Sequence, residues 1–136
     1  MRDVLISLLL LTFLVGCQTK SKVIVKEEPK EAEEMETELE KVWQGFLSAM
    51  QSGNEEEIKS FVTERGFESL GERIEPSERK NRFRIYGEGW SRWDIKWIEV
   101  SDEKAMAIVG AEFKKHGFEF IRTKDGWKLD RFMPGA

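Results

Sequence analysis

The chain has 136 residues, a formal net charge of -4 at pH 7 and 35% charged residues. An acidic chain lacks the basic overall field of a nucleic-acid-binding protein, so nucleic acid is not a predicted partner. One histidine and one cysteine are too few for the usual zinc ligand set. The chain also contains no calcium-loop motif and no phosphate-binding glycine motif, so we predict no metal site.

The N-terminal residues form an apolar run. Val4 to Val15 reads VLISLLLLTFLV, interrupted only by Ser7 and Thr12. A membrane-spanning helix needs about 20 apolar residues, and this run is shorter. A short apolar run at this place is typical of a signal peptide, which we predict over residues 1–16.

Leu14-Val15-Gly16-Cys17, which ends at the only cysteine, resembles the lipobox of bacterial lipoproteins. The resemblance implies that the mature chain begins at Cys17 and carries a thioether diacylglycerol there. No other cofactor is predicted. Two or more acyl chains anchor a protein stably in a membrane. The alternatives are an ordinary secretory signal with a chance cysteine, or an anchor that is not cleaved.

Lipidation at Cys17 has two implications. It leaves no thiol for a disulfide, so the exported domain must be stabilised by its core. Gln18 stands where inner-membrane lipoproteins of enteric bacteria have Asp. The resemblance therefore implies the outer membrane, facing the periplasm, if the host has two membranes. A host with a single membrane is the alternative.

Residues 17–36 are predicted to be a flexible acidic tether. The segment is rich in Glu and contains one apolar island, Val23 to Val25. Such a composition buries too little apolar surface to offset its chain entropy. A coil of this length separates lipid and domain by roughly 25 Å. A short strand at Val23 to Val25 is the alternative.

Residues 37–136 are predicted to form one α+β domain, which is enough chain for one hydrophobic core. Apolar residues from Met35 to Met50 recur with helical spacing, and Ser52-Gly53 ends that helix. Asn54 begins a second helix that Gly66 ends, and a short helical piece follows before Pro76. Residues 77–86 are left open as a helix or a strand.

The C-terminal part alternates in the manner of strands. Four strands are predicted, separated by turns at Ser101 to Lys104, Lys114 to Gly117 and Asp125-Gly126. Three hairpins in a row predict an antiparallel meander. Helices followed by strands predict that Trp43, Phe46 and Phe61 lie across one sheet face.

The stretches VWQGFLSAMQSGNEEEIKSFV and FEFIRTKDGWKLDRF resemble the nuclear-transport-factor-2-like (NTF2-like) superfamily, over roughly Leu39 to Phe132. The resemblance implies helices packed on a curved antiparallel sheet that forms a cone. The superfamily includes enzymes, carriers and interaction modules, so the fold does not determine function. Its enzymes often use an Asp or Tyr inside the cone, which here would be Asp94 or Tyr86.

No catalytic residue is predicted. The strand alternation places Asp94 on the face opposite Trp93 and Ile95. His116, the only histidine, lies in a predicted Lys-Lys-His-Gly turn as an exposed residue.

A possible ligand pocket is predicted from the aromatic residues Trp90, Trp93, Trp97 and Tyr86. Core packing is the alternative for Trp93, Trp97 and Trp127. Trp90, in a Gly-Glu-Gly-Trp loop, is the one expected to reach solvent.

A basic cluster is the second candidate site, with an anionic partner as its ligand. It consists of Arg79, Lys80, Arg82 and Arg84. A solvated face balanced by nearby Glu is the alternative.

The predicted function is that of a membrane-anchored lipoprotein whose domain is a non-enzymatic binding or assembly module in the cell envelope. Its expected partners are the membrane, through the lipid anchor, and an envelope protein or a small apolar ligand. A small-ligand carrier or an NTF2-like enzyme that uses the interior of the cone is the alternative.

Overall fold

A computed structural model describes the backbone of residues 20–111 and 113–135, and the side chains of that range from residue 33 onward. Internal contacts divide the chain into Met1–Glu34 and a compact unit, Met35–Ala136. The predicted signal peptide, residues 1–16, and the lipidation site Cys17 lie outside the described residues. Within the described range, no helix has the length and apolar character needed to cross a membrane.

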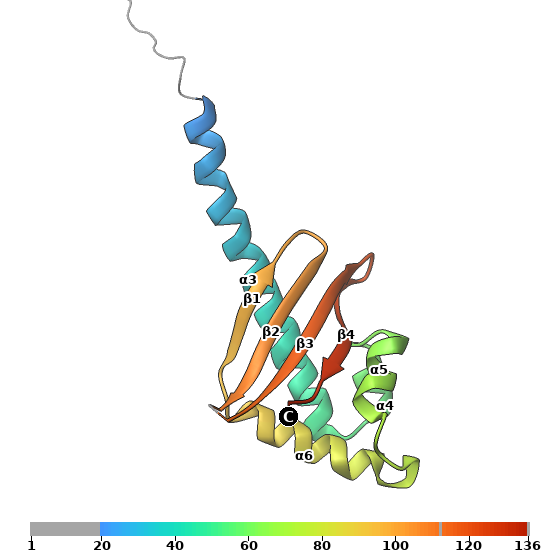
Figure 1. The fold of residues 1–136 in the computed structure, drawn as a ribbon. Coiled ribbons are helices and arrows are strands. Elements are labelled where there is room, and N and C mark those ends of the chain that lie inside the picture. Colours follow the sequence, from blue (N-terminus) through green and yellow to red (C-terminus); the bar gives the residue numbers. More distant parts are fainter. Residues whose placement is uncertain (1–19, 112, 136) are drawn as a thin grey trace, which may run out of the picture. The chain divides into compact units, whose positions relative to one another are not determined.

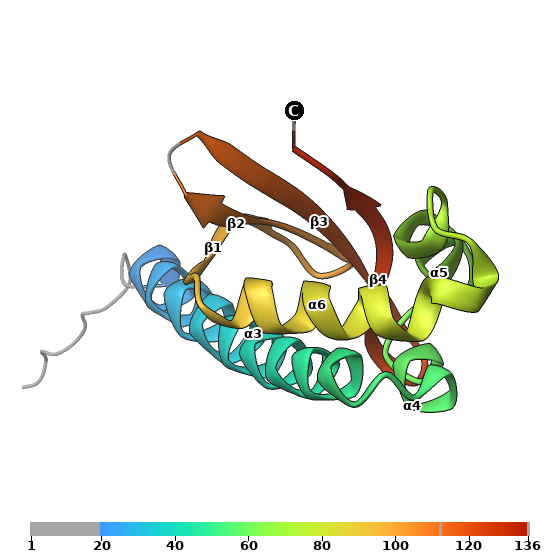
Figure 2. The ribbon, with the colours of Figure 1, turned by 90° about the horizontal axis from the view of Figure 1, so that it is seen from below.

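The compact unit is an α+β domain, as predicted. Its strands form one antiparallel sheet in the order β1-β2-β3-β4, and α3 and α6 lie on the same face of that sheet (Figures 1 and 2). In chain order the elements are α3 (Lys20–Ser52), α4 (Glu55–Lys59), α5 (Glu64–Gly71), the 3-10 turn η3 (Pro76–Glu78), α6 (Arg79–Ser91), β1 (Ile95–Val100), β2 (Lys104–Ala111), β3 (Lys114–Thr123) and β4 (Gly126–Met133).

Helix α3 begins at Lys20, inside the segment predicted to be a coil. Residues 20–36 are therefore helical, and neither the coil nor the short strand at Val23 to Val25 is found. Glu, Lys, Ala and Met are good helix formers. A helix that is already nucleated by its packed C-terminal half also extends without a second nucleation cost.

The core lies between α3 and the sheet. Trp43 and Phe46 of α3 are almost fully buried, and the Trp43 ring meets Phe118 of β3 edge-on at a centroid distance of 4.9 Å. The predicted placement of these two residues across the sheet face is confirmed. Phe61, the third residue predicted there, is only half-buried. The aromatic core gives the unit its stability without a disulfide.

Helix α6 forms where the sequence left residues 77–86 open. It contains Gly87 and Gly89, which are poor helix formers, so its sequence signal is weak. Packing explains Gly87, because a Cβ atom there would lie 2.9 Å from the Cβ atom of Met50 in α3. The two helices therefore approach each other closely at Gly87, and tertiary packing overrides the low intrinsic propensity.

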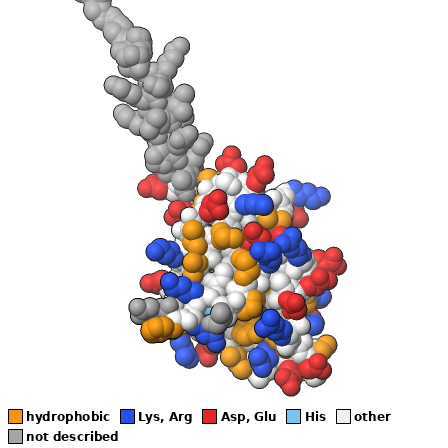
Figure 3. Space-filling view, viewed as in Figure 1, with side chains coloured by type: hydrophobic (Ala, Val, Ile, Leu, Met, Phe, Trp, Pro, Cys, Tyr) orange, Lys and Arg blue, Asp and Glu red, His pale blue; other side chains and the backbone are white. Residues whose placement is uncertain are grey.

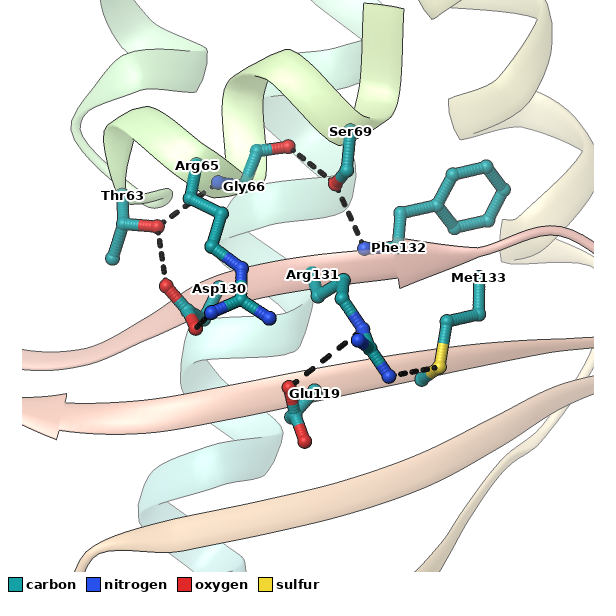
Figure 4. Close-up of polar contacts among 9 residues, drawn as sticks. All are labelled: Thr63, Arg65, Gly66, Ser69, Glu119, Asp130, Arg131, Phe132 and Met133. Atoms are coloured by element: carbon teal, nitrogen blue, oxygen red, sulfur yellow. Dashed lines mark hydrogen bonds and ion pairs between the residues drawn. The ribbon is translucent and has the colours of Figure 1, made fainter. Parts of the chain in front are cut away.

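Helix α5 is attached to β4 by hydrogen bonds (Figure 4). The Thr63 hydroxyl donates to Asp130 at 2.8 Å and accepts from the Gly66 backbone N–H at 2.9 Å, which caps α5. Further along, the Phe132 backbone N–H donates to the Ser69 hydroxyl at 2.9 Å. These bonds hold α5 against the end of β4.

The predicted end of the second helix at Gly66 is wrong. Helix α4 ends at Lys59, and Val62 pairs with Leu129 as an isolated parallel bridge. Gly66 lies inside α5, where a Cβ atom would come within 2.2 Å of the Leu129 carbonyl oxygen. The glycine therefore permits contact between α5 and β4 and does not act as a helix stop.

The β2–β3 hairpin also turns earlier than predicted. Ala111 pairs with Lys114, and Val109 pairs with His116. His116 is therefore a strand residue of β3, whereas the sequence placed it in a turn. Its side chain is half-buried instead of exposed, which changes its chemical role.

We expect Gly66→Ala to destabilise the domain by about 1–3 kcal/mol, because the added methyl group meets a backbone carbonyl that cannot move freely. Gly89→Ala is the matched control, since Gly89 is also helical and has no atom within 4 Å of a built Cβ. That change should stabilise α6 by roughly 0.5–1 kcal/mol. Urea unfolding of both variants measures the difference, and equal stabilisation by the two changes would contradict the close approach of α5 to β4.

Candidate functional site

The compact unit contains an open pocket of about 600 Å³. Its walls come from the end of α5, one face of α6, the β2–β3 hairpin and the residues that follow β4. A pocket of this size is in the range that holds a small organic ligand. The hydrogen bonds between α5 and β4 fix two of its walls relative to each other.

Aromatic side chains form much of the pocket lining. Tyr86, Trp90 and Trp93, all predicted as pocket residues, line it together with Ile85 and Phe132. Trp93 is 47% exposed and Ile85 is 56% exposed. These two lining residues therefore keep about half of their apolar surface exposed.

The solvent exposure of Trp90 and Trp93 is the reverse of what the sequence suggested. Trp90 lies in α6 and is only 5% exposed, whereas the sequence placed it in a loop that reaches solvent. Trp93 follows α6, precedes β1 and is exposed, so the core-packing alternative is wrong for it. The reason is that α6 extends to Ser91 and turns Trp90 inward.

Trp97 does not belong to the pocket. Its ring packs on Phe120 at 5.5 Å, and its indole N–H donates to the Glu40 carboxylate at 3.2 Å. Trp127 is a core residue, 4% exposed. Core packing is therefore the better description of both residues.

His116 lines the pocket in a defined hydrogen-bonding state. The Gly135 backbone N–H donates to His116 Nδ1 at 3.0 Å, so the ring is neutral and carries its proton on Nε2. Burial lowers the pKa of His116 below its ordinary value of 6.5, and the charge of Lys114 lowers that pKa further. No described residue accepts a hydrogen bond from Nε2, so this N–H remains available to a ligand.

Three residues of the predicted basic cluster lie by the turn between α3 and α4, and the fourth lines the pocket. Lys80 and Arg84 lie against Gly53, at the carboxyl end of α3. Arg79 covers the Phe67 ring and pairs with Glu55 at 3.7 Å. Only Arg82 lines the pocket. The helical turn of α6 therefore separates Arg82 from the other three residues.

The pocket lining is more basic than the chain as a whole. The charged lining residues are three cations, Arg73, Arg82 and Lys114, and one carboxylate, Glu72. His116 is neutral. None of the three cations forms an ion pair with a described residue. They can therefore neutralise a bound negative group without breaking an existing pair.

Asp94, a candidate through the NTF2-like resemblance, is exposed in the segment before β1 and is not among the pocket residues. In the part of the chain that the structure describes, no cluster of His, Cys, Asp or Glu side chains is arranged to hold a metal ion. The outer face of the sheet shows interspersed hydrophobic, basic and acidic side chains (Figure 3). Ile98 of β1 is 55% exposed and is not among the pocket-lining residues.

Comparison of the chain with protein-family models, with curated proteins and with solved structures gives no match.

Several pocket residues carried no signal in the sequence. Arg73 follows α5 and Lys114 begins β3, so only the tertiary fold brings them together with Arg82. Ile85 could have been found from the spacing Arg82, Ile85, Gly89 and Trp93, which marks one side of a helix. That spacing is informative only once residues 79–91 are known to be helical.

The hydrogen bond from Gly135 predicts a pH effect on stability. Since the folded pKa of His116 is lowered, the unfolded chain binds the proton at higher pH. The stabilising contribution of the neutral ring is therefore present above pH 6.5 and is lost as the pH falls through the folded pKa.

We expect the free energy of unfolding to fall more for the wild-type chain than for His116→Asn when the pH drops from about 7.5 to about 5.5. Asn keeps an acceptor near the Gly135 N–H and does not titrate in this range. Denaturant unfolding at the two pH values measures the difference. An equal fall in both proteins would show that His116 is not held in its neutral state.

Proposed function

We propose that the chain is a bacterial lipoprotein, lipidated at Cys17, whose domain is a non-enzymatic module that binds a small ligand in the cell envelope. The binding site is the pocket between α5, α6 and the β2–β3 hairpin. The observation that carries this proposal is the lining of a 600 Å³ pocket, where the exposed Trp93 and Ile85 lie beside cations that pair with none of the described carboxylates.

The domain is proposed to be NTF2-like, with the pocket at the open end of its cone. Support comes from the order of helices before strands and from the meander of β1 to β4, with α3 and α6 on one sheet face (Figure 2). The interior between α3 and the sheet is filled by Trp43, Phe118 and their neighbours. A ligand would therefore bind at the mouth and not in the centre.

The pocket favours binding over catalysis. A general base needs a free lone pair directed at its substrate. In His116 the lone pair of Nδ1 already accepts the Gly135 N–H. The ring offers a ligand a donor, Nε2–H, which suits recognition of an acceptor group.

The proposed location is the envelope face of a bacterial membrane, with the lipid at Cys17 as the anchor and residues 18–36 between lipid and domain. In a two-membrane host we propose the outer membrane, facing the periplasm. A pocket for a small ligand then lies within reach of molecules that move between the envelope layers.

Lipidation is tested by intact mass spectrometry of the chain expressed in a bacterium. We expect a product that begins at Cys17 and carries a diacylglycerol group, found in the membrane fraction. Cys17→Ser should abolish both the cleavage and the added lipid mass. A wild-type product that is cleaved without lipid would contradict the anchor and leave the pocket unaffected.

Ligand binding is tested by native mass spectrometry of the chain from Gln18 to Ala136, which keeps every described residue and lacks the lipid. After incubation with a bacterial envelope extract we expect a discrete small added mass. Trp93→Ala should remove it, since Trp93 lines the pocket. Ile98→Ala is the matched control, because Ile98 is similarly exposed at 55% but lies outside the pocket.

A retained small mass in both variants would place the ligand elsewhere on the domain. The absence of any added mass on the wild-type chain would contradict a small-ligand function in that extract and favour a protein partner.

A further inference from the structure

The side of α6 that faces the pocket combines one cation with apolar surface. Arg82, Ile85, Gly89 and Trp93 follow one another at intervals of three or four residues and all line the pocket. Arg84, only two residues from Arg82, lies on another side of the helix against Gly53. The same helix therefore supplies a pocket cation and a matched cation outside the pocket.

The charge of the pocket selects the sign of its ligand. The lining contains three cations, Arg73, Arg82 and Lys114, and one carboxylate, Glu72. The cations have no ion-pair partner among the described residues. The three cations would repel a positively charged ligand, and a neutral ligand would form no ion pair with them.

The apolar residues of the lining favour a ligand that also has an apolar body. Trp93 and Ile85 line the pocket and are each about half exposed. Tyr86, another lining residue, stacks on Trp90 at 5.1 Å. Covering such surface with a ring or a short apolar body removes it from water and is favourable.

We propose that the pocket binds a small amphipathic anion, whose apolar body covers Trp93 and Ile85 and whose negative group is held by Arg82. Arg73 and Lys114 strengthen the positive field around that group, and Nε2–H of His116 supplies a neutral hydrogen-bond donor. This inference rests on the proposed ligand-binding function and adds the chemical class of the ligand.

The test uses three probes with the same ring and different charge, namely naphthoate, naphthylmethanol and naphthylmethylammonium. Calorimetric titration of the Gln18 to Ala136 chain measures their affinities at low salt. We expect naphthoate to bind most tightly and the ammonium probe most weakly. Arg82→Gln should weaken naphthoate about tenfold, toward the affinity of the alcohol, because a charge-assisted bond is lost.

Arg84→Gln is the matched control, since it removes the same charge from the same helix outside the pocket. It should leave all three affinities unchanged, and Trp93→Ala should weaken all three probes. Equal binding of the three probes to the wild-type chain would overturn the anion preference and leave the proposed binding function standing. Failure of all three to bind would count against both. Equal loss of naphthoate affinity in both arginine variants would show that only the general charge of the protein matters.

Discussion

Trp90 is the residue on which the arrangement of this domain depends. It lies in α6 and is almost fully buried. Its ring meets Phe118 edge-on at 4.9 Å, Phe132 at 5.1 Å and Tyr86, stacked, at 5.1 Å. The same ring packs near Trp43 of α3. One side chain thus joins α6 to α3, β3 and β4, and truncating a buried aromatic of this kind typically costs about 3–5 kcal/mol.

This packing also explains why the pocket exists. The core residue Trp90 also borders the hollow, together with Arg82 and Ile85 of α6 and with Trp93, which follows the helix. The hydrogen bonds of Thr63 and Ser69 to β4 hold α5 as the facing wall. His116 closes the floor in its neutral state because the Gly135 N–H occupies Nδ1. Core packing and ligand site therefore meet at the Trp90 side chain.

The sequence predicted the class of fold and the order of the strands because the alternation of Ile95 to Val100 and the Asp125-Gly126 turn are strong local signals. It did not predict α6, since Gly87 and Gly89 weaken the helical pattern and only contact with Met50 explains the first of them. Missing α6 had a consequence for the site. Without the helix, Trp90 was expected in solvent and Trp93 in the core.

The charged part of the site was even harder to predict from the sequence. Arg73, Arg82 and Lys114 come from three elements, and no local pattern joins them. The sequence grouped Arg82 with Arg79, Lys80 and Arg84 because they are neighbours in the chain. In the fold Arg79, Lys80 and Arg84 lie by the turn between α3 and α4, against Glu55 and Gly53. Only Arg82 lines the pocket, because residues two positions apart on a helix point in different directions.

The five tryptophans of the chain provide a direct test of whether the pocket at α6 is the binding site. Their indole N–H signals in a nitrogen-15 NMR spectrum, assigned by Trp→Phe variants, report on different places. Trp90 and Trp93 line the pocket, whereas Trp97 and Trp127 do not. On titration with naphthoate we expect the signals of Trp93 and Trp90 to move and those of Trp97 and Trp127 to stay. Movement of Trp97 or Trp127 with Trp93 unchanged would contradict the account.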